Sequence, residues 1–302
     1  MTAGQVVQSL CHLATALRLR SGIEKIQVIR PFGWPDVQQV VDRSLSTDVV
    51  AWVMRLLLIN ANTTAAMTDT LVTAARRIVA NEVTVTGATA RFGARYIATR
   101  SAYAIAAHAT LDVYAERGRD ADAVVIACFG DPGLLALREL AQAPVIGMAE
   151  ASCREAARRG RFAIVTGGVG WITMLEEFVA QIGLSDLLCV VRAVTATGGE
   201  IAADPKRFER ILAQECRAAA TQDGAEVVIL GGAGLIGIAE RIASDVPVPV
   251  IDCLAAAIRT AEDTWAVPGW MQEPGARPVE TTGLSDRLAE LLSRRSGHEK
   301  RA

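Results

Sequence analysis

The chain has 302 residues, of which 51% are hydrophobic, so it can bury one large core or two smaller ones. Its formal net charge is −2 and charges of both signs are dispersed, which leaves no basic patch for nucleic acid. No apolar run is long enough to cross a membrane, because Arg55 interrupts the run at residues 50–59. We therefore expect a small-molecule substrate, and neither a nucleic-acid partner nor a membrane.

The cysteines and histidines lack the spacing of a metal site. No two cysteines form a Cys-x-x-Cys pair, and His12, His108 and His298 lie far apart in the chain. The sequence thus predicts no bound metal and no disulfide scaffold. Free thiols suit a reducing compartment, so we expect a cytoplasmic protein.

Residues 1–53 differ from the rest of the chain. They show little periodicity, carry two prolines at 31 and 35, and end just before Met54, where the first strand-like run begins. They lack the apolar core and cleavage pattern of a secretory signal. We interpret them as a poorly specified extension that precedes the globular protein.

Strand-like and helical patterns alternate from residue 54 to residue 262. Strands are predicted at 55–59, 82–86, 123–127, 145–147, 162–166, 188–194, 226–230 and 248–252. Helices are predicted at 65–79, 101–117, 134–142, 149–159, 174–182, 205–223 and 236–244. This alternation is typical of an α/β fold with parallel strands and right-handed crossovers.

The pattern occurs twice. Residues 124–128 (Val-Val-Ile-Ala-Cys), a glycine turn, a helix and Pro-Val-Ile recur from residue 227, and residues 55–59 resemble 161–165. We predict two pseudo-symmetric lobes, each with a parallel sheet flanked by helices, and an active-site cleft between them. The first lobe would span 54–150 and the second 151–262. A C-terminal tail and helix would follow at 263–302, and C-terminal helices would return to the first lobe. The alternative is chance similarity among valine-rich strands.

Cys128 is the first candidate catalytic residue. It follows the apolar run 123–127, and Gly130, Asp131, Pro132 and Gly133 then turn the chain into a helix. Asp131 suits the N-cap of that helix and Pro132 its first position. A helix N-terminus stabilises negative charge, so we expect the thiol to ionise more easily than a solvated one. The alternative is a small buried hydrophobic residue.

Loops at the ends of other strands have chemistry suited to an anion. Asn60 and Thr64 follow the first strand, and Thr166 and Gly167 hold the matching place in the second lobe. Their amides and hydroxyls can bind a carboxylate or imide oxygen. The glycine-rich segment that contains Gly232 and Ala233 faces Cys128 in the repeat and lets backbone approach a ligand. For each loop the alternative is ordinary N-capping.

Four segments resemble the aspartate/glutamate/hydantoin racemase superfamily, and within it the hydantoin racemase branch. They are 59–64 (Ile-Asn-Ala-Asn-Thr-Thr), 127–133 (Ala-Cys-Phe-Gly-Asp-Pro-Gly), 144–151 (Pro-Val-Ile-Gly-Met-Ala-Glu-Ala) and 223–231 (Asp-Gly-Ala-Glu-Val-Val-Ile-Leu-Gly). The resemblance extends from about residue 54 to residue 264. It implies a racemase without a cofactor, in which Cys128 is one of two thiols on opposite cleft walls. Asn60, Thr64, Thr166 and Gly167 would then line the pocket, and Gly130, Asp131, Gly232 and Ala233 are further candidates for substrate binding.

One position departs from this family. Its second cysteine lies in a Leu-Gly-Cys-Ala-Gly segment, and here the matching segment is Leu-Gly-Gly-Ala-Gly, with Gly232 in place of the thiol. Cys253, at the end of the strand predicted at 248–252, is a possible second acid or base. Its alternative role is a small packed residue under the following helix.

Three functions stay open from the sequence. The first is a racemase or epimerase of a hydantoin-like or amino-acid-like carbon acid, with Cys128 as thiolate base. The second is a decarboxylase or cis-trans isomerase on the same scaffold, in which one cysteine suffices, and Gly232 favours it. The third is a binding protein that has lost turnover, which the intact Cys128 segment disfavours. We also expect a homo-oligomer.

Overall fold

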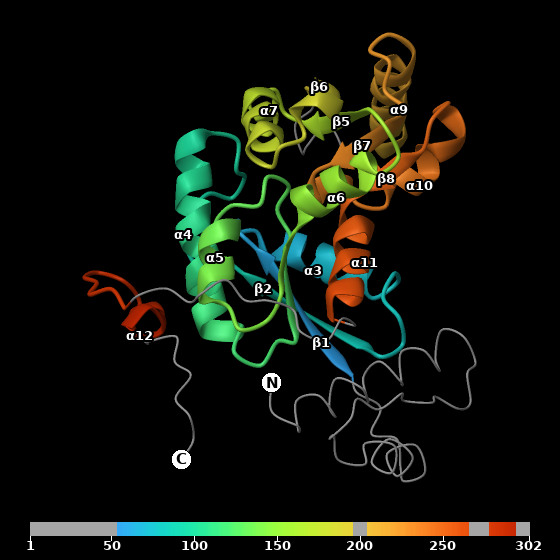
Figure 1. The fold of residues 1–302 in the computed structure, drawn as a ribbon. Helices are drawn as coiled ribbons and strands as arrows, with labels where there is room; N and C mark the ends of the chain where they lie inside the picture. The colour runs from blue at the N-terminus through green and yellow to red at the C-terminus, as the bar shows by residue number, and fades with distance from the viewer. Residues whose placement is uncertain (1–52, 196–203, 266–277, 294–302) are drawn as a thin grey trace, which may run out of the picture. The chain divides into compact units, whose positions relative to one another are not determined.

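A computed structural model describes residues 53–195, 204–265 and 278–293, and two parallel sheets form its framework (Figure 1). The first sheet contains β1 (Met54–Asn60), β2 (Val83–Thr89), β3 (Ala123–Ile126) and β4 (Val145–Gly147), in the order β2-β1-β3-β4. The second contains β5 (Phe162–Gly167), β6 (Leu188–Val194), β7 (Val227–Gly231) and β8 (Val250–Asp252), in the order β6-β5-β7-β8. We call the parts built on these sheets the first and second lobes. Their identical strand order confirms the predicted α/β fold.

Helices flank both sheets. The first lobe has α3 (Ala65–Ala75), α4 (Arg100–Arg117) and α5 (Leu134–Leu140), and the second has α7 (Trp171–Gln181), α9 (Pro205–Thr221) and α10 (Ile238–Ile242). The central strands are buried along almost their whole length, which explains their continuous apolar sequence. In a parallel sheet of this kind the carboxyl ends of the strands share one edge, and ligands bind there.

Three further helices connect the lobes or cover them. After β4 the chain enters α6 (Met148–Ala157), which packs against β7 and β8 of the second lobe (Figure 1). After β8 it enters α11 (Cys253–Trp265), whose Arg259 forms a 2.7 Å ion pair with Glu155 of α6. Near the C-terminus, α12 (Asp286–Ser293) packs against α4.

The strand register aligns the two lobes residue by residue. Ile126 pairs with Gly147, and Leu230 pairs with Asp252. Gly147 and Asp252 are each the last residue of the last strand in their sheet, so their partners Ile126 and Leu230 correspond to each other. Two residues further on, Cys128 corresponds to Gly232. The repeat as predicted matched Cys128 with Gly231, which was wrong by one residue because valine, isoleucine and leucine are interchangeable in a buried strand.

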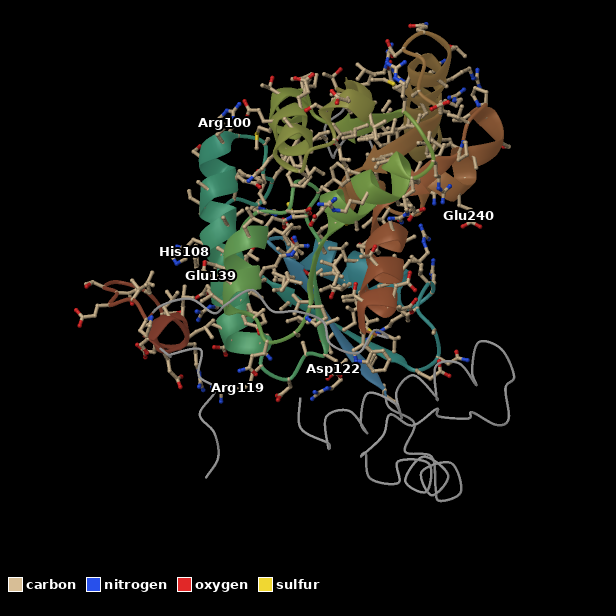
Figure 2. All side chains as sticks on the ribbon, in the orientation of Figure 1. Arg100, His108, Arg119, Asp122, Glu139 and Glu240 are labelled. Atoms are coloured by element: carbon tan, nitrogen blue, oxygen red, sulfur yellow. The ribbon has the colours of Figure 1, made fainter. Side chains whose placement is uncertain are left out.

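Both lobes also begin in the same way. The backbone N–H of Arg55, in β1, donates to Asp122 just before β3, at 2.8 Å. The backbone N–H of Arg161, just before β5, donates to Glu226 just before β7, at 2.7 Å. Figure 2 shows Asp122 at the end of the first lobe remote from α7. An acid thus accepts the same backbone hydrogen in each lobe, which supports the residue-by-residue alignment.

Some element boundaries differ from those predicted. The helix predicted at 174–182 begins earlier, at Trp171, and the one predicted at 236–244 is divided into α10 and a 3-10 turn at Ala243–Asp245. Helix α5 begins at Leu134 as predicted, but its N-cap is Gly133, in the left-handed conformation. Asp131 and Pro132 therefore lie outside this helix, and the N-cap prediction for Asp131 was wrong. None of the helices in the described ranges is long and apolar enough to cross a bilayer.

We expect the protein without residues 2–53 to fold and keep its activity. Residues Met54–Ala261, with Gln272–Ala302, form one compact unit to which Met1–Val53 do not belong. The predicted extension itself lies outside the described residues, apart from Val53. Circular dichroism melting curves and turnover of the truncated form would test this. Aggregation, or melting without cooperativity, would show that residues 2–53 complete the core.

Candidate active site

Cys128 lies at the carboxyl edge of the first sheet, two residues after β3, and is 8% exposed. The preceding residue, Ala127, donates its N–H to Ile59 of β1 at 2.9 Å. The carbonyl of Cys128 accepts the N–H of Asp131 at 3.0 Å, which closes a tight turn. The thiol makes no hydrogen bond to any described residue, so it is free to act on a ligand.

The Cys128 turn (residues 128–131) contacts the second lobe at two glycines. A methyl group on Gly231 would overlap the ring of Phe129, which follows Cys128. A methyl group on Gly130 would lie 2.6 Å from the ring of Trp171, the first residue of α7. These close approaches bring the Cys128 turn next to the segment that contains Gly232 and Ala233. Two of the predicted site segments therefore meet between the lobes.

Asn60 uses its side chain to build the loop after β1. Its Nδ2 donates to Thr68 Oγ1 at 3.0 Å and to the carbonyl of Thr64 at 3.2 Å, and its Oδ1 accepts the N–H of Asn62 at 3.1 Å. Asn60 is fully buried. Thr64 donates its hydroxyl to the carbonyl of Arg95 at 2.9 Å and makes no side-chain cap to α3. The side chains of both predicted ligand-binding residues are thus engaged within the first lobe.

Thr166 and Gly167 are the last two residues of β5, in the second lobe. Thr166 is 3% exposed, and its hydroxyl has no hydrogen-bond partner in the described part of the chain. Space is open at Gly167, since no heavy atom lies within 4 Å of the place where a Cβ would be. Thr166 Oγ1 lies 4.0 Å from the place where a Cβ on Gly232 would be, so this hydroxyl faces the Gly232 segment and is suited to a ligand oxygen.

Two tyrosines that sequence reasoning missed surround this region. Tyr96 donates its hydroxyl to the carbonyl of Gly167 at 3.0 Å, and Tyr103 of α4 donates to the carbonyl of Gly130 at 2.7 Å. Tyr103 also meets Trp171 edge to face, with 6.3 Å between ring centroids. Burial raises the pKa of both phenols, and the charge of an ionised Cys128 would raise each pKa further. Neither tyrosine lies near Cys128 in sequence, so only the fold could identify them.

Gly232 leaves room for a side chain that it does not have. The nearest atoms to a Cβ there would be Leu235 Cγ at 3.4 Å and Thr166 Oγ1 at 4.0 Å. The backbone of Gly232 has φ +155°, which L-residues rarely adopt. Ala233 begins the following 3-10 turn, Ala233–Leu235. The wall opposite Cys128 therefore carries no thiol at the position equivalent to Cys128.

Cys253 is the first residue of α11 and is completely buried. Its Sγ donates a long hydrogen bond, 3.9 Å, to the carbonyl of Gly232. Burial is the main reason that the pKa of this thiol is raised far above its ordinary value. The thiol that the sequence offered as a possible second acid or base thus contacts the backbone of Gly232.

Cys128 does not ionise easily in the free protein, so that prediction was wrong. Burial raises the pKa of its thiol to about 12, and the nearby negative charge of Asp131 adds to the effect. The helix that follows begins only at Leu134. The N-terminus of α6 is also unavailable to the thiol, because Asp131 accepts the N–H groups of Ala149 and Glu150, both at 2.8 Å.

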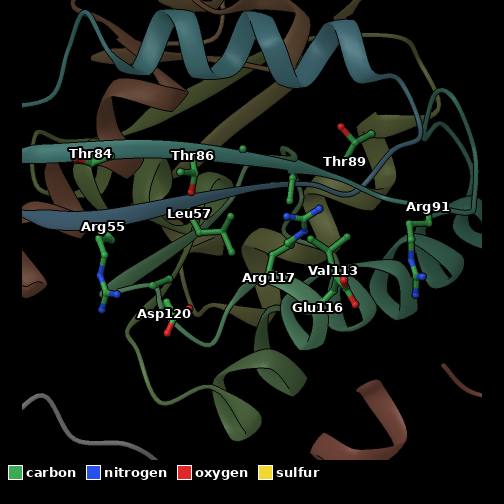
Figure 3. Close-up of a pocket in the computed structure, with 13 residues that line it drawn as sticks. Arg55, Leu57, Thr84, Thr86, Thr89, Arg91, Val113, Glu116, Arg117 and Asp120 are labelled. Atoms are coloured by element: carbon green, nitrogen blue, oxygen red, sulfur yellow. The ribbon is translucent and has the colours of Figure 1, made fainter. Parts of the chain in front are cut away.

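Two cavities are lined in part by residues of the first lobe. A groove of about 600 Å³ lies between β1, β2 and α4, and its walls include Leu57, Thr86 and Arg117 (Figure 3). A second cavity of about 450 Å³ is lined by Asp131 of the Cys128 turn and Phe178 of α7. Neither includes Cys128. No group of three or more histidine, cysteine or acidic side chains in the described ranges could hold a metal ion. We locate the candidate site at Cys128 from its chemistry, not from cavity size.

Known proteins with this architecture include several racemases. The hydantoin racemase of Paenarthrobacter aurescens is 34% identical over 217 residues, which cover 71% of this chain and 92% of that protein. The allantoin racemase structure from Klebsiella pneumoniae is 31% identical, with a TM-score of 0.70 over 78% of this chain and 98% of its own. That from Pseudomonas fluorescens is 30% identical, with a TM-score of 0.73 over 76% and 100%.

The two-lobed fold and these relatives define the protein as an isomerase of the racemase class. Residues 56–261 match the model of the Asp/Glu/Hydantoin racemase family. The chain belongs to this family, as its sequence motifs predicted.

Proposed function

We propose that the protein is a cofactor-independent racemase or epimerase of a hydantoin-like or amino-acid-like carbon acid, with Cys128 as the thiolate base. The position of Cys128 carries the proposal, because it combines a strand end, a thiol without a hydrogen-bond partner in the described ranges, and a turn that contacts the other lobe. The names of the relatives support a cyclic ureide, such as a 5-substituted hydantoin or allantoin, as substrate.

The raised pKa of Cys128, about 12, suits the removal of a proton from carbon. A thiolate whose conjugate acid is weak is a strong base, although little of it is present at neutral pH. The negative charge then moves to an oxygen of the substrate, where hydrogen-bond donors must stabilise it. The hydroxyl of Thr166 is suited to that task, because it has no hydrogen-bond partner among the described residues and lies 4.0 Å from the place where a Cβ on Gly232 would be.

The proton must return from the other face for the centre to invert. Gly232 offers no acid there, so two candidate sources are Cys253, which bonds the Gly232 carbonyl, and a water molecule in the space that Gly232 leaves. The same glycine favours a second candidate function, a decarboxylase or cis-trans isomerase in which one thiol suffices. A binding protein without turnover stays a third alternative.

A substrate screen separates these functions. The protein would be given single enantiomers of 5-substituted hydantoins, allantoin, aspartate and glutamate, and optical rotation would be followed. Parallel assays would follow carbon dioxide release from arylmalonates and isomerisation of maleate. We expect loss of optical rotation with a cyclic ureide. Carbon dioxide release or isomerisation without racemisation would favour the second candidate, and no turnover in any assay would favour a binding protein.

A further inference from the structure

Asp131 is held in an unusual conformation by three hydrogen bonds. Its φ is +54°, and no other non-glycine residue in the described ranges has a positive φ. Its N–H donates to the carbonyl of Cys128, and its two carboxylate oxygens accept the N–H groups of Ala149 and Glu150, the second and third residues of α6. Asp131 is 2% exposed. It therefore ties the Cys128 turn directly to α6.

In the second lobe a carboxylate also accepts the N–H groups at the start of a helix, but it comes from a different position in the lobe. Asp252, the last residue of β8, accepts the N–H groups of Leu254 and Ala255 at 3.0 Å and that of Gly237 at 2.7 Å. Its counterpart by register is Gly147, where an added Cβ would overlap the carboxylate of Asp131. The two carboxylates thus fill equivalent sites, but only the one in the first lobe is attached to the cysteine turn.

The negative charge of Asp131 has no direct ion-pair partner among the residues that the structure describes. The groups that face it are Tyr103 from α4, Arg138 from α5, and Glu150 and Cys153 from α6. Arg138 pairs instead with Glu150 at 2.7 Å, as does Arg154 of α6 at 2.8 Å. Burial, as the largest cause, raises the pKa of Asp131 to about 7, and its two backbone hydrogen bonds limit the rise. Asp131 therefore changes charge near neutral pH.

We propose that Asp131 is a positioning residue for Cys128, which fixes the cysteine turn on α6 and places a buried carboxylate in the same turn as the thiol. This inference rests on the proposed function, in which Cys128 is the reacting thiol. Its main test measures the reactivity of the Cys128 thiol and needs no substrate. The inference about Asp131 and the proposed function can therefore fail separately.

The charge is tested by Asp131→Asn, with Asp252→Asn as the matched control. Alkylation of Cys128 by iodoacetamide is followed by mass spectrometry of its peptide between pH 6 and pH 9. At pH 6 Asp131 is mostly neutral, so Asp131→Asn and the wild type should react at similar rates. Above pH 7 the variant should react faster, by roughly tenfold for each unit by which the pKa of the thiol falls. Asp252→Asn should match the wild type throughout.

A merely structural role of Asp131 gives a different result. If asparagine only loosens the turn, Cys128 reacts faster by the same factor at every pH, and that outcome would overturn the charge argument. Equal rates for Asp131→Asn and wild type at pH 9 would also overturn it. Cys189, which is half-buried on β6, reports general unfolding and should react at an unchanged rate in all three proteins.

The fixing of the turn is tested by moving the carboxylate. In the double variant Asp131→Gly/Gly147→Asp, the acid would extend from β4, as Asp252 extends from β8. Glycine suits the φ of +54° at position 131, and Gly147 has an ordinary φ of −83°, although its new Cβ would lie 2.8 Å from Leu134 Cδ2 and this side-chain end must shift. We expect near wild-type alkylation at pH 9 but at least tenfold lower turnover. Wild-type turnover would show that the tether contributes nothing.

Discussion

Cys128→Ser should lower turnover by about 10²–10⁴-fold while the protein stays folded. Serine is nearly the same size as cysteine, but its hydroxyl is a much weaker acid than a thiol, so the base is lost. The Cys128 thiol has no hydrogen bond to any described residue, and its removal breaks no such contact. The melting temperature is therefore expected to change by only a few degrees. The measurements are kcat/KM on the substrate found in the screen and a melting curve.

Cys189→Ser is the control for this variant. Cys189 is half-buried on β6 and takes no part in the candidate site, so its replacement should leave kcat/KM unchanged. Turnover near the wild-type value in Cys128→Ser would show that another residue removes the proton. The two tyrosines near Cys128 would then be the next residues to replace.

In deuterium oxide, the wild-type protein should exchange the hydrogen of the reacting carbon faster than it inverts the centre. Cys128 can remove a proton and return a deuteron to the same face, while the opposite wall has no side chain at Gly232. Gly232→Cys should raise the rate of inversion toward that of exchange, because it adds an acid on the second wall. Proton NMR follows exchange, and optical rotation follows inversion.

Gly232→Ala separates the thiol from the backbone change. Any residue other than glycine at a φ of +155° is strained by about 1–3 kcal/mol, and alanine carries the same strain as cysteine. The added Cβ has room, since its nearest neighbour lies at 3.4 Å. If the wild type inverts as fast as it exchanges, a second acid is already present. Loss of that inversion in Cys253→Ala would then identify Cys253 as the acid.

The sequence predicted the strands, their alternation with helices and the location of Cys128 at a strand end. These features depend on local apolar runs and on glycine and proline turns. The helix cap of Asp131 could not be predicted, because its partners Ala149 and Glu150 lie 18 and 19 residues further along the chain. The direction of the Cys128 pKa shift also required the fold, since burial is its largest cause.

In the candidate site, too, some features follow from local sequence and others depend on the fold. Thr166 and Gly167 were predicted from their place after a strand, and among the described residues the Thr166 hydroxyl has no hydrogen-bond partner, although its role in binding stays a prediction. The side chains of Asn60 and Thr64 looked equivalent in sequence but are bonded within their own lobe. Side-chain bonding of this kind depends on loop geometry, which one sequence does not reveal.

Contacts between the lobes have a consequence for motion. The hydroxyl of Tyr96 donates to the carbonyl of Gly167, Phe129 packs on Gly231, and Arg100 pairs with Glu177 of α7 at 2.6 Å. Parting the lobes would break the first bond and pull on Phe129, the immediate neighbour of Cys128. Any separation of the lobes would therefore move the turn that carries the Cys128 thiol. We expect a substrate bulky enough to part the lobes to displace the proposed base from the reacting carbon, which would select against bulk without a steric clash at that carbon.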